Sequence, residues 1–406
     1  MNTNLLSRLK GQKVVVIGDI MIDEYLDGRV NRISPEAPVP VHHVKNSTYT
    51  SGGAANAARN IAKLGGVAKI LSVTGDDPDS VRLCRLLEDD GICTKGISKC
   101  KDRPTIKKTR ITSLNHQLMR IDWESTSHIS QRVEESIMQS LKSCKFDTVL
   151  ISDYGKGLLT DNLLKSIIEY SHSIGKPVVV DPKGKDFSKY LDADIITPNR
   201  NEARGAIGGN ENLQQNSREL AQSILDRYGV KSVLLTLSAE GMLYLDRSGI
   251  EIYEIPTAKE VYDVSGAGDT VAAVFSLCMN SDIDMANAVH LATLAAGIVV
   301  EKWGTQAVSS KELEMLIEKD ETKSGNLSPT ISGFWVKSTD FLETLSESKT
   351  FDPETSIFLI ENENIDSIGK IESKGGLKYM NITKKNLPQL IEKQNIRIIG
   401  TLQDNL

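Results

Sequence analysis

Short apolar runs rich in β-branched residues recur along the N-terminal three quarters of the chain, and each of them closes on a polar or helix-breaking residue. Continuous runs of this kind are typical of strands buried on both faces of a parallel sheet. The predicted strands are residues 13–19, 69–75, 148–153, 177–182, 194–199 and 232–238.

Amphipathic helical patterns separate these strands, and several end in glycine, as helix C-termini often do. Examples are residues 56–65, 161–175 and 217–229. The alternation predicts an α/β fold with a doubly wound, mostly parallel sheet covered by helices on both faces.

Ligands of such sheets bind at the carboxyl ends of the strands, so the polar residues that close the strands mark a candidate cleft. Each of them has an alternative role as the cap of the following helix. These residues are Asp19, Asp153, Asp181, Asn199 and Ser238.

Two segments, residues 29–44 and 103–122, interrupt the alternation. Their prolines and period-two patterning predict short antiparallel edge strands that form a small β lid beside the main sheet. We therefore expect one large domain over residues 1–320, a Gly-, Ser-, Thr- and Pro-containing linker over 321–333, and a small C-terminal β/α region over 334–406. This last region carries no recognisable chemical motif.

Composition narrows the possible partners. The chain has 39% hydrophobic and 25% charged residues and a net charge of -6, with no broad basic field for nucleic acid. Five cysteines without a C-x-x-C pair indicate reduced thiols and a cytoplasmic location. Neither a signal-like segment nor an apolar run long enough for a membrane span is expected. A small-molecule partner fits best.

The string SGAGD at 265–269, followed by the apolar stretch 270–279, predicts a glycine-rich turn that opens a helix. Unpaired N–H groups and the helix dipole favour an anion there, so Ser265 to Gly268, with Gly266 and Ala267 between them, form a candidate anion site for a phosphoryl group. Asp269 is a candidate base for an attacking hydroxyl. The alternative is a carboxylate that is merely favoured by the dipole, beside glycines that make a tight turn.

Three strings together resemble the ribokinase-like (pfkB) carbohydrate kinases: SGGAANAARNIAKLG at 51–65, TPNRNE at 197–202 and DVSGAGDT at 263–270. The likeness covers residues 10–318. RISPEAPVPV at 32–41, DYGKGLL at 153–159 and DPKGKDF at 181–187 are similar to the kinase half of bacterial heptose kinase/adenylyltransferases. That resemblance implies ATP-dependent phosphorylation of D-glycero-β-D-manno-heptose 7-phosphate at the anomeric hydroxyl, for ADP-heptose and lipopolysaccharide precursors.

The resemblance also implies roles for single residues. Asp269 would be the general base, Asn199 and Glu202 would organise Mg²⁺ through water, and Asp263 would hold its loop or a K⁺ ion. Thr236, Ser238 and Gly241 resemble the nucleotide loop. The expected substrate-binding residues are Asp19, Asp23, Gly52, Gly53, Asn56, Lys107, Arg110, Arg120, Asp153, Lys156 and Lys183, with Lys108 as a further cation.

These substrate residues have structural alternatives: a strand-end turn and a helix capped by Ser51, or solvated surface charges. His42 and His43 are expected on the lid surface rather than at zinc. A Walker A or dinucleotide fingerprint after the first strand is absent, which disfavours P-loop and Rossmann enzymes.

The chain also departs from the bifunctional relatives. No histidine follows His290, so the H-x-G-H signature of their nucleotidyltransferase half is missing from the C-terminal region. We expect a homodimer through the lid. Two alternative functions stay open: a kinase of another sugar or sugar phosphate, and a non-catalytic sugar-phosphate-binding scaffold.

Overall fold

A computed structural model of the chain describes residues 4–114, 116–208, 216–256 and 261–323, together with five strands beyond them. Its main element is a sheet in the order β13-β12-β11-β10-β9-β8-β1-β4-β5. The strands from β11 to β5 run parallel, and β12 and β13 form an antiparallel edge. The bounds are β1 Lys13–Gly18, β4 Val67–Gly75, β5 Cys93–Cys100, β8 Thr148–Ser152, β9 Val178–Asp181, β10 Ile195–Ile196, β11 Ser232–Thr236, β12 Met242–Asp246 and β13 Glu251–Glu254.

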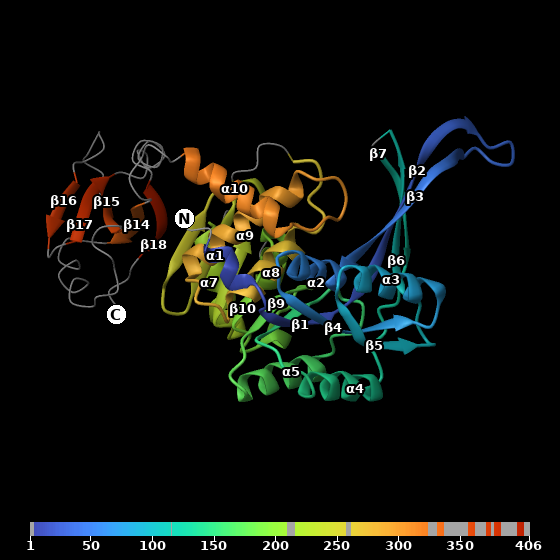
Figure 1. Cartoon of the computed structure of the whole chain (residues 1–406), viewed down its shortest axis with the longest axis horizontal. Helices are drawn as coiled ribbons and strands as arrows, with labels where there is room; N and C mark the ends of the chain where they lie inside the picture. Colours follow the sequence, from blue (N-terminus) through green and yellow to red (C-terminus); the bar gives the residue numbers. More distant parts are fainter. Residues whose placement is uncertain are drawn as a thin grey trace.

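Helices cover both faces of this sheet, which confirms the predicted fold class (Figure 1). Val14 and Val16 of β1 pack into one core with α2, α8 and α9, while Val15 and Ile17 pack into the other with α4, α5 and α7. The helices are α1 Asn4–Leu9, α2 Ala54–Lys63, α3 Pro78–Asp89, α4 Gln131–Lys142, α5 Asp161–Ser173, α6 Arg200–Ile207, α7 Ser217–Tyr228, α8 Ala267–Cys278, α9 Met285–Val300 and α10 Ser310–Lys323, with short 3₁₀ turns η1 Ser188–Tyr190 and η2 Ser238–Glu240.

The two segments that interrupt the alternation lie in a second sheet that stands off the main body (Figure 1). Its order is β3-β2-β6-β7, with β2 Ile20–Ile33, β3 Pro40–Gly53, β6 Ile106–Ser113 and β7 His116–Trp123. We call these four strands the lid sheet. β2 begins almost directly after β1, so the lid strands are longer than residues 29–44 and 103–122 suggested.

The alternation of side chains gives the lid sheet two chemically different faces. Asp23 of β2 lies opposite Lys108 of β6, and Tyr25 lies opposite Arg110, so these side chains share one face. Lys107 projects from the other face. We call the face with Asp23 and Arg110 the inner face, because Asp23 contacts Thr305 of the main domain. The opposite face, which carries Lys107, is the outer face.

The C-terminal region adds a five-stranded sheet in the order β16-β17-β15-β14-β18, with β18 beside β13 (Figure 1). The strands are β14 Ile331–Val336, β15 Ser356–Glu361, β16 Ile371–Lys374, β17 Leu377–Ile382 and β18 Ile396–Thr401. Two elements reach into the span 321–333 that we expect to be a linker: helix-favouring Glu and Lys residues carry α10 to Lys323, and β14 starts at Ile331. Residues 324–330 lie outside the described part of the chain.

Within the described residues, no helix has both the length and the apolar character that crossing a membrane would require.

Candidate active site

Asp269 lies in the first turn of α8, and its side chain is held by two donors from distant parts of the chain. Asn56 Nδ2 of α2 donates to Oδ2 at 2.8 Å, and the Tyr154 hydroxyl, from the loop after β8, donates to Oδ1 at 2.8 Å. The residue is only 3% exposed. Tertiary structure therefore brings together three residues that lie far apart in sequence.

Burial raises the pKa of Asp269 to about 7, and the negative charge of Asp23 acts in the same direction. The hydrogen bonds from Asn56 and Tyr154 oppose this rise, since they stabilise the ionised form. A carboxyl group that titrates near neutral pH can accept a proton and release it again, which suits a general base.

The glycine-rich turn before α8 is required by this arrangement. Gly266 has a left-handed φ of 81°, and a Cβ there would lie 2.6 Å from Asn56 Nδ2, blocking the amide that reaches Asp269. Gly268 is exposed, and a Cβ on it would be 3.9 Å from Asp181 Oδ2. The Ala267 N–H donates to Val264 O at 3.3 Å. The predicted anion site thus sits at the N-terminus of α8, beside Asp181.

Asp23 and the Gly52-Gly53 pair connect the lid sheet to this site. The buried carboxylate of Asp23 accepts hydrogen bonds from Arg110 and, at 3.0 Å, from Thr305 Oγ1. Asp23 Oδ2 would lie 2.3 Å from a Cβ on Gly52, so glycine is needed there. Gly53 has a φ of 61° and precedes α2, where Asn56 is fully buried.

One polar atom of Asn56 has no hydrogen-bond partner among the described residues. The Nδ2 donates to Asp269, whereas the buried Oδ1 accepts from none of them. A buried carbonyl oxygen without a donor is costly, so a ligand hydroxyl at this point would be stabilised.

Asp19 and Asp153 were expected to bind substrate, but their carboxylates organise the loop after β8. Asp19 accepts the N–H groups of Tyr154, Lys156 and Leu158 at 3.1–3.4 Å. Asp153 accepts from the Gly155 N–H, and from Lys189 and Tyr190 side chains at 2.6 and 2.7 Å. Both are almost fully buried. The nearby strand-closing Asp181 is partly exposed instead, and burial together with the charges of Asp269 and Glu202 raises its pKa well above the ordinary value.

Asn199 and Glu202 form a capping box at the start of α6. Asn199 Oδ1 accepts the N–H of Glu202 at 2.9 Å, Glu202 Oε2 accepts the N–H of Asn199 at 3.1 Å, and Lys183 Nζ donates to Glu202 Oε1 at 2.8 Å. Among the described residues no group of three or more acidic, His or Cys side chains would hold a metal directly. The side-chain oxygens of Glu202, Asn199 and Asp181 are suitable partners for an Mg²⁺ ion that keeps most of its bound water.

The three residues expected at the nucleotide lie together beyond β11, next to Asn199. Thr236 forms an isolated parallel β-bridge with Asn199. Ser238 begins η2 with a φ of 54°, and Gly241 follows it with a φ of 101°. A Cβ on Gly241 would lie 1.9 Å from Glu254 O, so only glycine fits this turn. Asp263 accepts the Ser265 N–H at 2.8 Å, so it holds the loop before α8.

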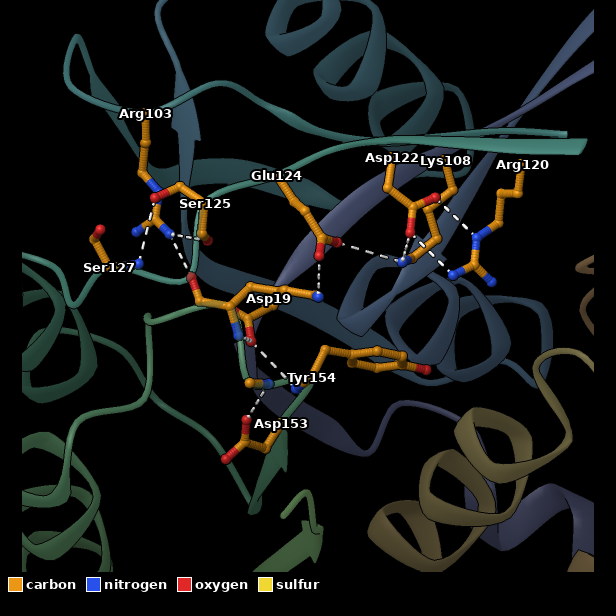
Figure 2. A network of polar contacts seen from close by, with 12 residues as sticks. Asp19, Arg103, Lys108, Arg120, Asp122, Glu124, Ser125, Ser127, Asp153 and Tyr154 are labelled. Atoms are coloured by element: carbon orange, nitrogen blue, oxygen red, sulfur yellow. Dashed lines mark hydrogen bonds and ion pairs between the residues drawn. The ribbon is translucent and has the colours of Figure 1, made fainter.

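Five charged side chains of alternating sign connect the lid sheet to the loop after β8 (Figure 2). Arg120 pairs with Asp122 at 2.8 Å, and Lys108 lies 3.5 Å from both Asp122 and Glu124. Lys156 pairs with Glu124 at 2.6 Å. Burial raises the pKa of Glu124, but the hydrogen bond from Lys156 and the charge of Lys108 outweigh this and lower it. We call these five residues the charge chain.

The cations expected to bind phosphate lie on different faces of the lid sheet and have different partners. Lys108 and Lys156 converge on Glu124, whereas Lys107 points from the opposite face of the lid sheet to Asp79 at 2.7 Å. Arg110 is engaged by Asp23. Alternation along a strand sends neighbouring residues to opposite faces, and the sequence alone does not show which of the two faces is the inner one.

Sequence reasoning missed Tyr154, Asp122, Glu124 and Thr305. Tyr154 lies inside the string DYGKGLL, one position after a strand-closing aspartate, and this position was its only signal. Nothing local marks Thr305, which reaches Asp23 from the end of the main domain.

Comparison with known proteins agrees with this geometry. The profile of the pfkB family carbohydrate kinases matches residues 11–312. The bifunctional protein HldE of Syntrophotalea carbinolica is 41% identical over 312 residues, covering 76% of this chain and 64% of that protein. HldE of Campylobacter fetus is 40% identical over 315 residues, with 77% and 67% covered. The chain thus matches about two thirds of the length of these relatives.

Solved structures show the same fold. Ribokinase of Arabidopsis thaliana, in complex with ribose and ATP, has a TM-score of 0.61 and 22% identity, with 76% of this chain and 99% of that one covered. Phosphofructokinase-2 of Escherichia coli has a TM-score of 0.64 and 18% identity over the same shares. The extent of the family match, with Asp269 at its glycine-rich turn, leads to one conclusion: the chain belongs to the pfkB family and is a ribokinase-like carbohydrate kinase.

Proposed function

We propose that the chain uses ATP and Mg²⁺ to phosphorylate D-glycero-β-D-manno-heptose 7-phosphate at its anomeric hydroxyl, which yields the 1,7-bisphosphate for ADP-heptose synthesis. The observation that carries the proposal is the buried Asp269 at the N-terminus of α8, with a pKa of about 7. The similarity to HldE proteins supports the heptose substrate.

In the proposed reaction, Asp269 accepts the proton of the anomeric hydroxyl while that oxygen attacks the γ-phosphorus of ATP. The bond between the γ-phosphorus and its bridging oxygen breaks, and ADP leaves. The turn at Gly266, Ala267 and Gly268 would stabilise negative charge on the transferred group. Asn56 Oδ1 would accept a sugar hydroxyl, and Mg²⁺ near Glu202 and Asn199 would neutralise phosphate charge.

A terminal phosphate on the acceptor is supported by the cations of the charge chain. Lys108 and Lys156 lie on either side of Glu124, one from the lid sheet and one from the loop that presents Tyr154 to Asp269. A phosphate bound there would bridge the lid sheet to the main domain. Charge-assisted contacts from two lysines and Arg120 suit a dianion.

We also propose that two copies pair through the outer face of the lid sheet. Met119, Ile121 and Trp123 of β7 are large and apolar, and they are 58%, 38% and 43% exposed. Exposed apolar groups of this kind commonly mark interaction sites. Separately, we propose that a K⁺ ion binds near the loop that Asp263 holds.

The experiment that tests the reaction is incubation of the protein with ATP, Mg²⁺ and heptose 7-phosphate, with the product identified by mass and phosphorus NMR. We expect a bisphosphate with a phosphoryl group on the anomeric oxygen. Higher activity on unphosphorylated sugars would instead favour a kinase of another sugar, and no turnover of any sugar phosphate would favour the non-catalytic scaffold.

Asp269→Asn should abolish turnover and leave ATP and sugar-phosphate binding within a few-fold, because the amide keeps the shape but cannot accept the proton. A loss of at least about a thousandfold in kcat is expected. Titration calorimetry with each substrate is the control for binding. Near-normal kcat in this variant would remove Asp269 as the base.

A further inference from the structure

We infer that Tyr154 is a positioning residue for the phosphoryl transfer, whose hydroxyl holds Asp269 ionised and aims it at the acceptor. The inference rests on the proposed function, because it assigns Asp269 the role of base. Tyr154 and Asn56 bind different oxygens of the carboxylate, at 2.8 Å each, so together they fix the plane of the group. Neither donor comes from α8 itself.

The position of Tyr154 is fixed independently of Asp269. Its backbone N–H donates to Asp19 Oδ2 at 3.2 Å, and the same carboxylate accepts the N–H groups of Lys156 and Leu158. On the other side, the Tyr154 ring lies close to the start of α2, where a Cβ on Gly53 would be in van der Waals contact with it at 3.5 Å. Figure 2 shows Tyr154 held next to Asp19 in this loop, and its hydroxyl therefore reaches Asp269 from a loop that is organised in advance.

The hydroxyl of Tyr154 stays protonated and is a donor to the ionised Asp269. Burial and the charges of Asp269 and Asp181 raise the pKa of Tyr154 well above its ordinary value, so the phenol keeps its proton. A donor that cannot ionise favours the charged form of the carboxylate and disfavours its protonated form. Each carboxylate oxygen retains a second lone pair that can accept the proton of the acceptor hydroxyl.

The acidic side chains near Asp269 oppose its ionisation. Asp23 of β2 adds negative charge, which Arg110 of β6 offsets in part, and Asp181 at the end of β9 also faces the site. Asp181 in turn is influenced by Glu202 and Lys183. Asn56 and Tyr154 are the two side-chain donors shown at Asp269 within the described chain, and removing one should raise its pKa.

The test is Tyr154→Phe, measured as kcat/KM against pH with ATP, Mg²⁺ and heptose 7-phosphate. We expect the acidic limb to move up by about one pH unit, with a roughly tenfold loss of kcat/KM below the limb. Activity should recover to within a few-fold of the wild type at pH 9. This recovery would distinguish a shifted proton affinity from a damaged fold.

Tyr228→Phe is the matched control, because it also removes a buried hydroxyl, one that donates to Ala206 O outside the site. Its acidic limb should coincide with that of the wild type. If Tyr154→Phe lowers kcat/KM equally at every pH, or leaves it unchanged, Tyr154 does not hold Asp269 ionised and the inference is wrong.

A second measurement is independent of the acceptor. Infrared difference titration of the ligand-free protein, wild type against Asp269→Asn, gives the pKa of the Asp269 carboxyl, and the same pair in a Tyr154→Phe background should give a higher value. An unchanged value overturns the inference about Tyr154 alone. Retained activity in Asp269→Asn would overturn the proposed base itself, so the two failures are distinguishable.

Discussion

The burial of Asp269 links its catalytic suitability to the stability of the protein. Its folded-state pKa of about 7 lies above the ordinary value of 3.8, so the folded chain binds this proton more tightly than the unfolded chain between those pH values. Stability rises with pH only where the unfolded state binds more protons. The contribution of Asp269 is therefore fully present below about pH 4 and is lost as the pH rises through 7.

Asp269→Asn removes this titration and should change the pH dependence of unfolding. The free energy of unfolding of the variant, minus that of the wild type, is expected to grow between pH 4 and pH 7 and to be flat above pH 8. Each unit of pKa shift corresponds to about 1.4 kcal/mol. Urea unfolding at a series of pH values measures the difference, and a constant difference would contradict the raised pKa.

Among the elements, the glycine-rich turns and the strand ends bring side chains of different helices and loops together at Asp269. Gly52 and Gly53 let β3 pass Asp23 and turn into α2, and Gly266 lets Asn56 of α2 reach Asp269 of α8. The loop after β8 is fixed by Asp19 at the end of β1 and presents Tyr154 and Lys156 to different partners. Glycines that allow close approach and the Asp19 carboxylate at a strand end therefore hold these elements in place relative to one another.

The charge chain allows a prediction about the acceptor. Lys156→Ala should raise KM for heptose 7-phosphate about tenfold, since a charge-assisted contact to the terminal phosphate is lost. KM for ATP should stay within about twofold. Initial-rate kinetics with each substrate varied in turn makes this measurement.

Lys165→Ala provides the control, because Lys165 is an exposed lysine of α5 whose ion pair with Glu169 is long, at 3.8 Å. Its kinetics should match the wild type. If Lys156→Ala raised KM equally for a phosphorylated and an unphosphorylated acceptor, Lys156 would have no phosphate to bind.

In the whole molecule, the lid sheet stands apart from the main domain (Figure 1). Its edge strand β7 carries exposed apolar residues. A monomer would leave Met119, Ile121 and Trp123 in water, whereas pairing of two lid sheets would bury them. Asp23 and Arg110 lie on the inner face of the same sheet, so pairing through the outer face would not cover them.

Met119→Glu should therefore shift the protein from dimer to monomer in sedimentation velocity runs at micromolar concentration, because a buried charge without a partner is strongly unfavourable. Ile174→Glu, at an exposed apolar position after α5, should leave the sedimentation coefficient unchanged. A wild type that sediments as a monomer throughout would contradict pairing through the lid sheet.

The sheet class, the six strands of the alternating pattern and the place of Asp269 at a helix start could all be predicted from the amino-acid sequence. These follow from local periodicity and from motif residues whose backbone requirements are visible in one stretch. It also pointed to Asn56, Glu202 and Lys156. Their joint position came from the resemblance to the kinase family rather than from spacing.

Which side chains meet, in contrast, depends on the packing of segments that are distant in sequence. Tyr154 and Asn56 converge on Asp269 from separate elements, Lys108 rather than Lys107 lies on the inner face, and Asp19 and Asp153 spend their oxygens on a loop. A strand shows its alternation in sequence but not which face is buried, and a polar strand end does not show whether it binds a ligand or a neighbouring N–H. Packing between distant segments settles both questions.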